Sequence, residues 1–440
     1  MREDIATGFR VGGRRDRGSG TARSMADVRP GDENTWGLGR ARSAQPFDLR
    51  RQNYSTILRT VMQRGPIARS ELAALTGMAT GTMTKLTSLL AEVELLRELP
   101  AETGQGMPGR PRTPIAIDGS RYRVIGMHFG LRRTSICLLD LQGHLMAEVR
   151  LAHRRGALDA IMEQAVRGAR DLIARTPGTV LGVGASAGGW VDREAGVVRD
   201  HRVLRWRDVP LRDTLTSALG MPAEIDSSFR ALAMAERWFG GAQDVDDLVS
   251  LFVGNVVGAG FVLGGEVFRG HTAAAGTIDH LSVGVAGQER CSCGRYDCLH
   301  AVASDLAVLS RARTAGLVGA RGSLEQLVEV ARDGSVPARE LLTQRAELVG
   351  VAAGTLVEML DPEVVVVSGG VVDAPEYLLD VRRGAHAYLR DKRAVDVESV
   401  IRLSAFGTDS AAVSAGSVIL DQIYAAPSDF VPALRELRYG

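Results

Sequence analysis

Three cysteines in one short segment, with a histidine upstream, constrain the fold of this chain more than any other feature. They are Cys291, Cys293 and Cys298, and the histidine is His280. Zinc prefers four Cys or His ligands in a tetrahedron, and a site with four protein ligands leaves no open position for chemistry. The spacing therefore predicts a structural Cys₃His zinc site. The alternative is three buried or incidental cysteines.

The remaining cysteine, Cys137, lies alone in an apolar stretch. One cluster and one lone cysteine make a poor disulfide framework.

The sequence has no apolar run of about 18 residues, and its N-terminus lacks the apolar core of a signal peptide. We therefore expect a cytoplasmic protein with no membrane partner.

Length and charge bound the domain organisation. A chain of 440 residues is long enough for two or three domains. Apolar residues make up 45% and charged residues 24%, as in ordinary folded proteins. The net charge is +1, so any charge that binds DNA must be local. Residues 1–45 show no apolar period, which predicts a disordered tail or an over-long start.

A helical pattern begins at about Asn53, where Ile57, Leu58, Val61 and Met62 recur at helical spacing. Gly65-Pro66 ends this helix, and a second helix is predicted from Arg69 through Leu75. A glycine turn at Thr76-Gly77-Met78 leads to a third helix from about Ala79 past Leu90. This order predicts a helix-turn-helix, with a structural helical bundle as the alternative.

The third helix of such a motif reads the major groove with the exposed face of its N-terminal end. Here that face carries Thr80, Gly81, Thr84 and Lys85, which can contact base edges or phosphate. Arg69 begins the second helix and is predicted to contact a backbone phosphate.

Two short strands are predicted after the third helix, at Leu95 to Glu98 and Pro114 to Asp118. They would form a β-hairpin wing with Gly109-Arg110-Pro111-Arg112 at its edge. Arg110 and Arg112 are predicted to enter the minor groove, where the negative potential is strongest.

From Tyr122 onward, strands and helices alternate, with β-rich openings near Val124 and again near Val249. The segment Val364 to Val367 is a late apolar strand. This pattern predicts a duplicated α/β architecture.

Residues 50–118 resemble the N-terminal domain of the ROK family (repressor, open reading frame, kinase). The resemblance rests on Gly65-Pro66, Arg69-Ser70-Glu71-Leu72-Ala73, Thr76-Gly77-Met78, Gly109-Arg110-Pro111, and Arg51 with Asn53. Ala68 departs from the family, which usually has a serine there. A serine would cap the second helix, a contribution of about 1 kcal/mol.

Residues 122 to about 425 resemble the ROK sugar-kinase domain, through Gly182-Val183-Gly184-Ala185-Ser186, Gly258-Ala259-Gly260, Gly276 to His280, the cysteine loop and Ser368-Gly369-Gly370. The resemblance implies an α/β multidomain protein: a winged helix-turn-helix followed by a two-lobed actin-like (ribonuclease H-like) ATPase-fold domain. The expected boundaries are a tail over 1–45, the DNA-binding domain over 46–118, the sensor domain over 119–428 with lobes of about 119–240 and 241–428, and a tail over 429–440.

The same resemblance argues against kinase activity. His128 stands where the family has the aspartate that serves metal and phosphates, and Ser228 stands at the position of the catalytic base. Asp226 could replace that base only if the turn were shifted. We therefore expect no enzyme, with an active sugar kinase carrying a DNA-binding domain as the alternative.

The family's sugar-binding positions are altered as well. They correspond to Ser228, Arg230, Thr277, His280 and His300, and only His280 keeps the family residue. Arg230 and His300 would suit an anion such as a sugar phosphate or sugar acid. A pocket that has lost ligand binding and an unmodified sugar remain as alternatives.

The resemblance also implies a homodimer on a palindromic operator, with a repressor of sugar uptake or metabolism genes as the expected function. Ligand binding would change the distance between the two DNA-binding domains of the dimer. A regulator whose sensor domain serves only to dimerise is a further alternative.

Overall fold

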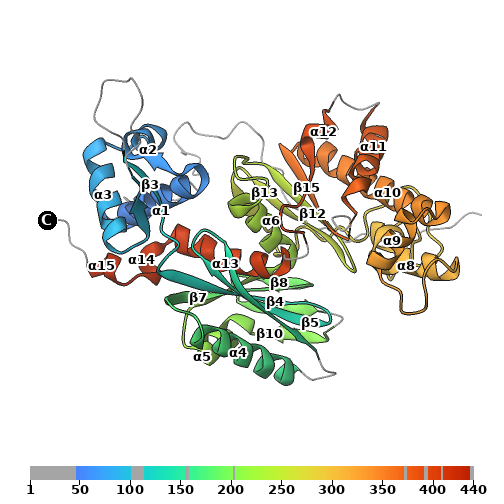
Figure 1. Ribbon diagram of the computed structural model, residues 1–440, viewed down its shortest axis with the longest axis horizontal. Coiled ribbons are helices and arrows are strands. Elements are labelled where there is room, and N and C mark those ends of the chain that lie inside the picture. The colour runs from blue at the N-terminus through green and yellow to red at the C-terminus, as the bar shows by residue number, and fades with distance from the viewer. Residues whose placement is uncertain are drawn as a thin grey trace, which may run out of the picture. The chain divides into compact units, whose positions relative to one another are not determined.

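The computed structural model describes residues 46–100, 113–153, 158–201, 204–370, 374–390, 395–407 and 410–436 (Figure 1). The predicted tail over residues 1–45 lies outside this range, as do Arg110 and Arg112 of the predicted wing. Pro46–Gly440 forms one compact unit.

The N-terminal region contains three helices and a small antiparallel sheet of order β1-β3-β2. Gly77 ends the second helix with a φ of 69°, the left-handed conformation expected of this turn. Ala68 precedes that helix without a side-chain cap. Strand β1 was not predicted, and it completes the sheet. The elements are α1 (Pro46–Arg64), β1 (Ile67–Ala68), α2 (Arg69–Thr76), α3 (Thr80–Glu92), β2 (Leu96–Glu98) and β3 (Pro114–Ile117).

Two five-stranded sheets form the rest of the framework and share one topology. In each, the first three strands are antiparallel neighbours, and the fourth and fifth run parallel to the first. This agreement supports the predicted duplication. In spatial order the first sheet is β11 (Ala223–Ser227), β7 (Thr179–Ala187), β4 (Tyr122–Phe129), β5 (Arg133–Asp140) and β6 (Leu145–Ala152). The second is β14 (Glu266–Phe268), β13 (Val257–Leu263), β12 (Leu248–Val253), β15 (Val364–Gly369) and β16 (Ile401–Leu403).

Helices cover these sheets, and a third, small sheet extends the first lobe. That sheet consists of β8 (Trp190–Asp192), β9 (Val197–His201) and β10 (Trp206–Val209). Helix α6 (Ser228–Phe239) packs between α13 (Ser410–Ala425) and strands β12 and β13 of the second sheet. The helices of the first lobe are α4 (Leu158–Ala174), α5 (Leu211–Leu219) and α13. Those of the second are α7 (Leu299–Ala303), α8 (Asp305–Thr314), α9 (Leu324–Arg332), α10 (Val336–Leu360), the 3₁₀ helix η1 (Pro375–Tyr377), α11 (Leu378–Leu389) and α12 (Val397–Val400).

Helix α13 corrects the expected boundary between the lobes. Although it follows the second lobe in sequence, it packs on the first sheet, where the Cys137 thiol donates to the Ala412 carbonyl at 3.1 Å. A Cβ on Gly184 of β7 would lie 2.1 Å from the Ala415 carbonyl oxygen, so glycine lets α13 approach the strand. The close approach of the helix accounts for this glycine.

The segment predicted as a C-terminal tail is folded through residue 436. It contains α14 (Pro427–Phe430) and α15 (Ala433–Glu436), and Val431 and Leu434 are buried. Both residues belong to a hydrophobic cluster that also contains Ile57 of α1 and Ile423 of α13. The N-terminal helices therefore share a core with the sensor domain, because the last helices of the chain pack against both.

Candidate functional site

His280 and the three predicted cysteines lie together in the structure. Their ligand atoms are all within 4.8 Å of one another. The Sγ atom of Cys291 is 3.3 Å from Nδ1 of His280, and the Sγ atoms of Cys293 and Cys298 are 3.3 Å apart. A single ion with bonds of about 2.0–2.3 Å can span such a group. These four residues could therefore hold a metal ion.

The surroundings of the cluster suit a cation. A carboxylate oxygen of Asp279 lies 3.4 Å from Nε2 of His280, which leaves Nδ1 facing the cysteines. A hydrogen bond from the Arg295 backbone lowers the pKa of the Cys293 thiol to about 6. Burial raises the pKa of the Cys298 thiol to about 12. Because α7 begins directly after Cys298, the cluster also positions His300.

The positions of the two kinase carboxylates lie next to each other. His128 Nδ1 is 3.0 Å from Ser186 Oγ and 3.5 Å from Ser228 Oγ. Burial lowers the pKa of His128 to about 4, so its imidazole is neutral at pH 7. Neither a neutral imidazole nor a hydroxyl supplies a carboxylate that could bind Mg²⁺ or deprotonate a sugar hydroxyl.

Asp226 does not replace the missing base. Its Oδ1 accepts from Arg230 Nε at 2.6 Å, and its Oδ2 accepts from Arg269 at 3.2 Å. Arg193 NH1 lies 3.6 Å from Oδ2. Burial opposes ionisation of Asp226, but these arginines outweigh it and hold the pKa of the carboxyl below its ordinary value. Asp226 is therefore a buried counter-ion for three arginines.

Arg230 is engaged within the protein and does not offer an anion site. Besides its bond to Asp226, it donates to the carbonyls of Ala273 and Val191, each at 2.8 Å. All three guanidinium nitrogens thus have protein acceptors, which the sequence could not show because those carbonyls are distant along the chain.

The other predicted ligand residues do not line either of the two cavities that stand out in the described residues. Thr277 is exposed, and its hydroxyl donates to the Ala274 carbonyl at 2.9 Å. His300 is half-buried, and burial lowers its pKa.

The predicted reading residues lie on one side of α3. Thr80, Gly81 and Thr84 are exposed and Lys85 is partly exposed, whereas Met83, Leu86 and Leu90 are buried. Arg69 has protein partners: its Nε donates to Thr87 Oγ1 at 2.8 Å and its NH2 to Glu98 Oε1 at 2.6 Å. These bonds connect α2 to α3 and β2.

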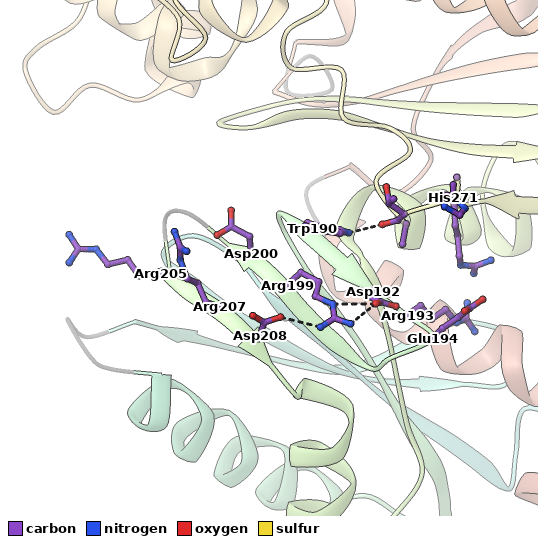
Figure 2. A pocket seen from close by; sticks show the side chains of 14 residues that line it. Trp190, Asp192, Arg193, Glu194, Arg199, Asp200, Arg205, Arg207, Asp208 and His271 are labelled. Carbon is purple, nitrogen blue, oxygen red and sulfur yellow. Dashed lines mark hydrogen bonds and ion pairs between the residues drawn. The ribbon is translucent and has the colours of Figure 1, made fainter. Parts of the chain in front are cut away.

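One feature that the sequence did not predict is a charged cavity of about 1290 Å³ between the small sheet β8–β10 and the loop after β14 (Figure 2). Its lining consists of Trp190, Asp192, Arg193, Glu194, Arg199, Asp200, Arg205, Arg207, Asp208, Arg269, Gly270, His271, Thr272 and Ala273. The alternation of arginine and acidic residues between 192 and 208 was the only local signal for it.

A chain of ion pairs runs from this cavity to helix α1. Arg193 lies 3.9 Å from Asp421 of α13, and Asp421 lies 3.4 Å from Arg59 of α1. Arg59 also lies 3.4 Å from Glu266 of β14 and over the ring of Trp238, with 5.5 Å between the guanidinium carbon and the ring centroid. Arg59 therefore contacts both lobes.

These features define a class: a two-lobed α/β protein of the actin-like kinase fold, with a Cys₃His cluster that could hold a metal ion. A profile of the ROK family matches residues 124–422. The chain therefore belongs to the ROK family.

Its relatives include transcriptional regulators. The chain is 31% identical over 395 residues to a transcriptional regulator of Mycobacterium tuberculosis, covering 85% of this chain and 86% of the relative. It is 26% identical over 343 residues to the DNA-binding transcriptional dual regulator NagC of Escherichia coli K12, covering 76% and 84%. A protein from E. coli O157:H7 with the same match is named N-acetylglucosamine repressor.

A solved structure shares the fold. It is a ROK family transcriptional regulator described as a homologue of the E. coli MLC protein, with a TM-score of 0.73 at 23% identity, covering 88% of this chain and all of that one. Within the described residues, no helix is long and apolar enough to cross a membrane.

Proposed function

We propose that this ROK protein is a sequence-specific DNA-binding regulator of sugar uptake or metabolism genes, with residues 46–118 as a winged helix-turn-helix. The observation that carries the proposal is α3, which follows a glycine turn and presents Thr80, Gly81, Thr84 and Lys85 on its outer side. Its other side packs into the shared core, so the polar side is left for a DNA groove. Arg110 and Arg112 would add contacts in the minor groove.

The regulator acts as a homodimer on a palindromic site, because a two-fold symmetric protein matches a two-fold symmetric operator. A small sugar-derived effector shifts the protein between two states that differ in operator affinity. Zinc bound by His280, Cys291, Cys293 and Cys298 holds the loop that leads into α7. We place the protein in the cytoplasm, with DNA.

DNA recognition is tested by capturing genomic fragments with the purified chain and sequencing them. We expect one palindromic motif, near genes of sugar transport or metabolism. Thr84→Ala and Lys85→Ala should each weaken binding to that motif by about 5- to 150-fold, the effect of about 1–3 kcal/mol per base contact.

Thr56→Ala is the matched control, because Thr56 is also an exposed helical threonine that bonds the carbonyl four residues before it, but in α1. It should leave the affinity unchanged. Weak binding that disappears with salt and enriches no motif would contradict the proposal.

The kinase alternative makes a different prediction. We expect no hexose-dependent ATP turnover by the full chain, because the positions of the metal-binding aspartate and the base hold His128 and Ser228. General base catalysis alone contributes about 10²–10⁴-fold to a rate. A coupled ADP assay with a panel of neutral hexoses checks this, and saturable sugar-dependent turnover would establish the kinase instead.

A further inference from the structure

Arg69 joins three elements of the N-terminal region through one side chain. It is the first residue of α2 and directly follows β1. Its Nε donates to Thr87 Oγ1 in α3 at 2.8 Å, and its NH2 donates to Glu98 Oε1 at 2.6 Å. Glu98 is the last residue of β2. The guanidinium therefore connects α3, the helix proposed to enter the major groove, to the strand that leads into the wing.

The bond to α3 is made on the buried side of that helix. Thr87 is fully buried, and its hydroxyl donates to the Met83 carbonyl at 2.9 Å. The hydroxyl proton is thus already used, and the oxygen accepts the N–H of Arg69. Thr87 lies about one helical turn after Thr84, which is proposed to contact DNA. Arg69 is therefore attached to the part of α3 that carries the DNA contacts.

The bond to β2 is made at the base of the wing. The backbone N–H of Leu99, the next residue, donates to the Pro114 carbonyl at 2.9 Å, which holds the two ends of the wing segment together. Glu98 itself pairs with Ile115 of β3. Because the two strands are hydrogen-bonded, a bond that fixes Glu98 also fixes the base of the wing.

The exposure of the two charged side chains indicates what this link can do. The side chain of Glu98 is 56% exposed and that of Arg69 is 20% exposed. An ion pair with one exposed partner contributes little to the stability of a fold. Two charge-assisted hydrogen bonds, however, give a planar guanidinium a defined orientation. Loss of the link should therefore change the geometry of the DNA-binding face more than it changes folding.

We propose that Arg69 is a positioning residue for operator recognition, which sets the place of the wing relative to α3 by bonding Thr87 and Glu98. The inference rests on the proposed function in DNA binding. A winged helix-turn-helix that places α3 in the major groove and the wing in the minor groove makes both contacts only at one relative placement. Arg69 holds this placement in the free protein, so less ordering is needed when DNA binds.

Direct contact between Arg69 and a phosphate would give the opposite results. Glu98 would then compete with DNA for the guanidinium, and its removal would strengthen binding. Loss of Arg69 would also weaken binding to every DNA sequence and reduce the salt slope by about 1. A positioning residue instead affects the operator alone, because only the operator rewards simultaneous contacts in both grooves.

The test is titration of the full chain with the captured operator fragment and with a random duplex of equal length, over a salt series. Glu98→Ala should weaken operator binding about tenfold, the effect of one hydrogen bond to a charged group, although it removes a negative charge from the DNA-binding domain. Glu98→Gln keeps an oxygen acceptor and should bind nearer to the parent.

The double variant Arg69→Ala/Glu98→Ala leaves the net charge of the chain unchanged. It should bind the operator at least as weakly as Glu98→Ala does. Its affinity for the random duplex and its salt slope should match those of the parent, because no phosphate contact is lost.

Glu92→Ala is the matched control, because Glu92 is an exposed glutamate of α3 and its removal takes the same charge from the same domain. It should bind the operator no more weakly than the parent. Unchanged or tighter operator binding by Glu98→Ala, or weaker binding of the random duplex by the double variant, would overturn the inference. Failure of the DNA-binding function gives a different result, since the parent itself would then show no preference for the operator, and it would overturn both proposals.

Discussion

Asp226→Asn is expected to lower the free energy of unfolding by about 3–5 kcal/mol, the cost of breaking a buried ion pair and leaving its partner uncompensated. Arg193, Arg230 and Arg269 all lie around this carboxylate, which is fully buried. The asparagine keeps the size of the side chain and removes only the charge. Denaturant unfolding followed by far-UV circular dichroism measures the difference.

The effect should depend on pH in a defined direction. The folded-state pKa of Asp226 is lowered, so its stabilisation is complete above the ordinary carboxyl pKa of about 3.9 and is lost as pH falls through the lower folded value. The parent and the variant should therefore converge in acid. Asp208→Asn is the control: Asp208 is exposed and also pairs with an arginine, and its loss should cost less than about 1 kcal/mol. Equal stability of Asp226→Asn and the parent at pH 7 would contradict the assignment of Asp226 as a counter-ion.

Cys298→Ser is expected to have the second large effect, because it removes a buried ligand of the proposed zinc site. The zinc content of the purified chain, measured by metal analysis, should fall from about one ion per chain to less than about a tenth of an ion, since the site needs all four ligands. We expect the free energy of unfolding to fall by about 4–5 kcal/mol, as for other losses of a structural metal. Hydrogen exchange should accelerate over residues 279–303, while α4 should keep its protection.

Cys137→Ala separates this effect from the loss of any cysteine, because Cys137 is buried in the first lobe and lies outside the cluster. Its zinc content should match that of the parent. A parent protein that binds no zinc would refute the site.

Much of the local structure was predictable from the sequence. The three N-terminal helices follow from apolar residues at helical spacing, and Gly77 takes the positive φ expected of its turn. The grouping of His280 with the cysteines follows from spacing, because ligands a few residues apart can reach one ion. The substitutions at His128 and Ser228 were visible against the family pattern, and the structure adds that the two side chains are adjacent.

The partners of the arginines were not predictable, and they decide what this chain can bind. Arg230 was expected to bind a ligand, but its NH1 and NH2 groups donate to the carbonyls of Ala273 and Val191 instead. Arg69 was predicted to contact DNA, and the structure adds a bond from its NH2 group to Glu98 that the sequence did not show.

The sequence by itself determined most of the helices and strands and the membership of the Cys₃His cluster, because each depends on residues close together in the chain. Only the tertiary structure decided that α13 returns to the first lobe, that the last helices share a core with α1, and that strands β8, β9 and β10 meet the loop 269–273 around a cavity. The physical reason is that these contacts join segments far apart in sequence. Their geometry depends on how whole sheets and helices pack, which no local pattern of residues specifies.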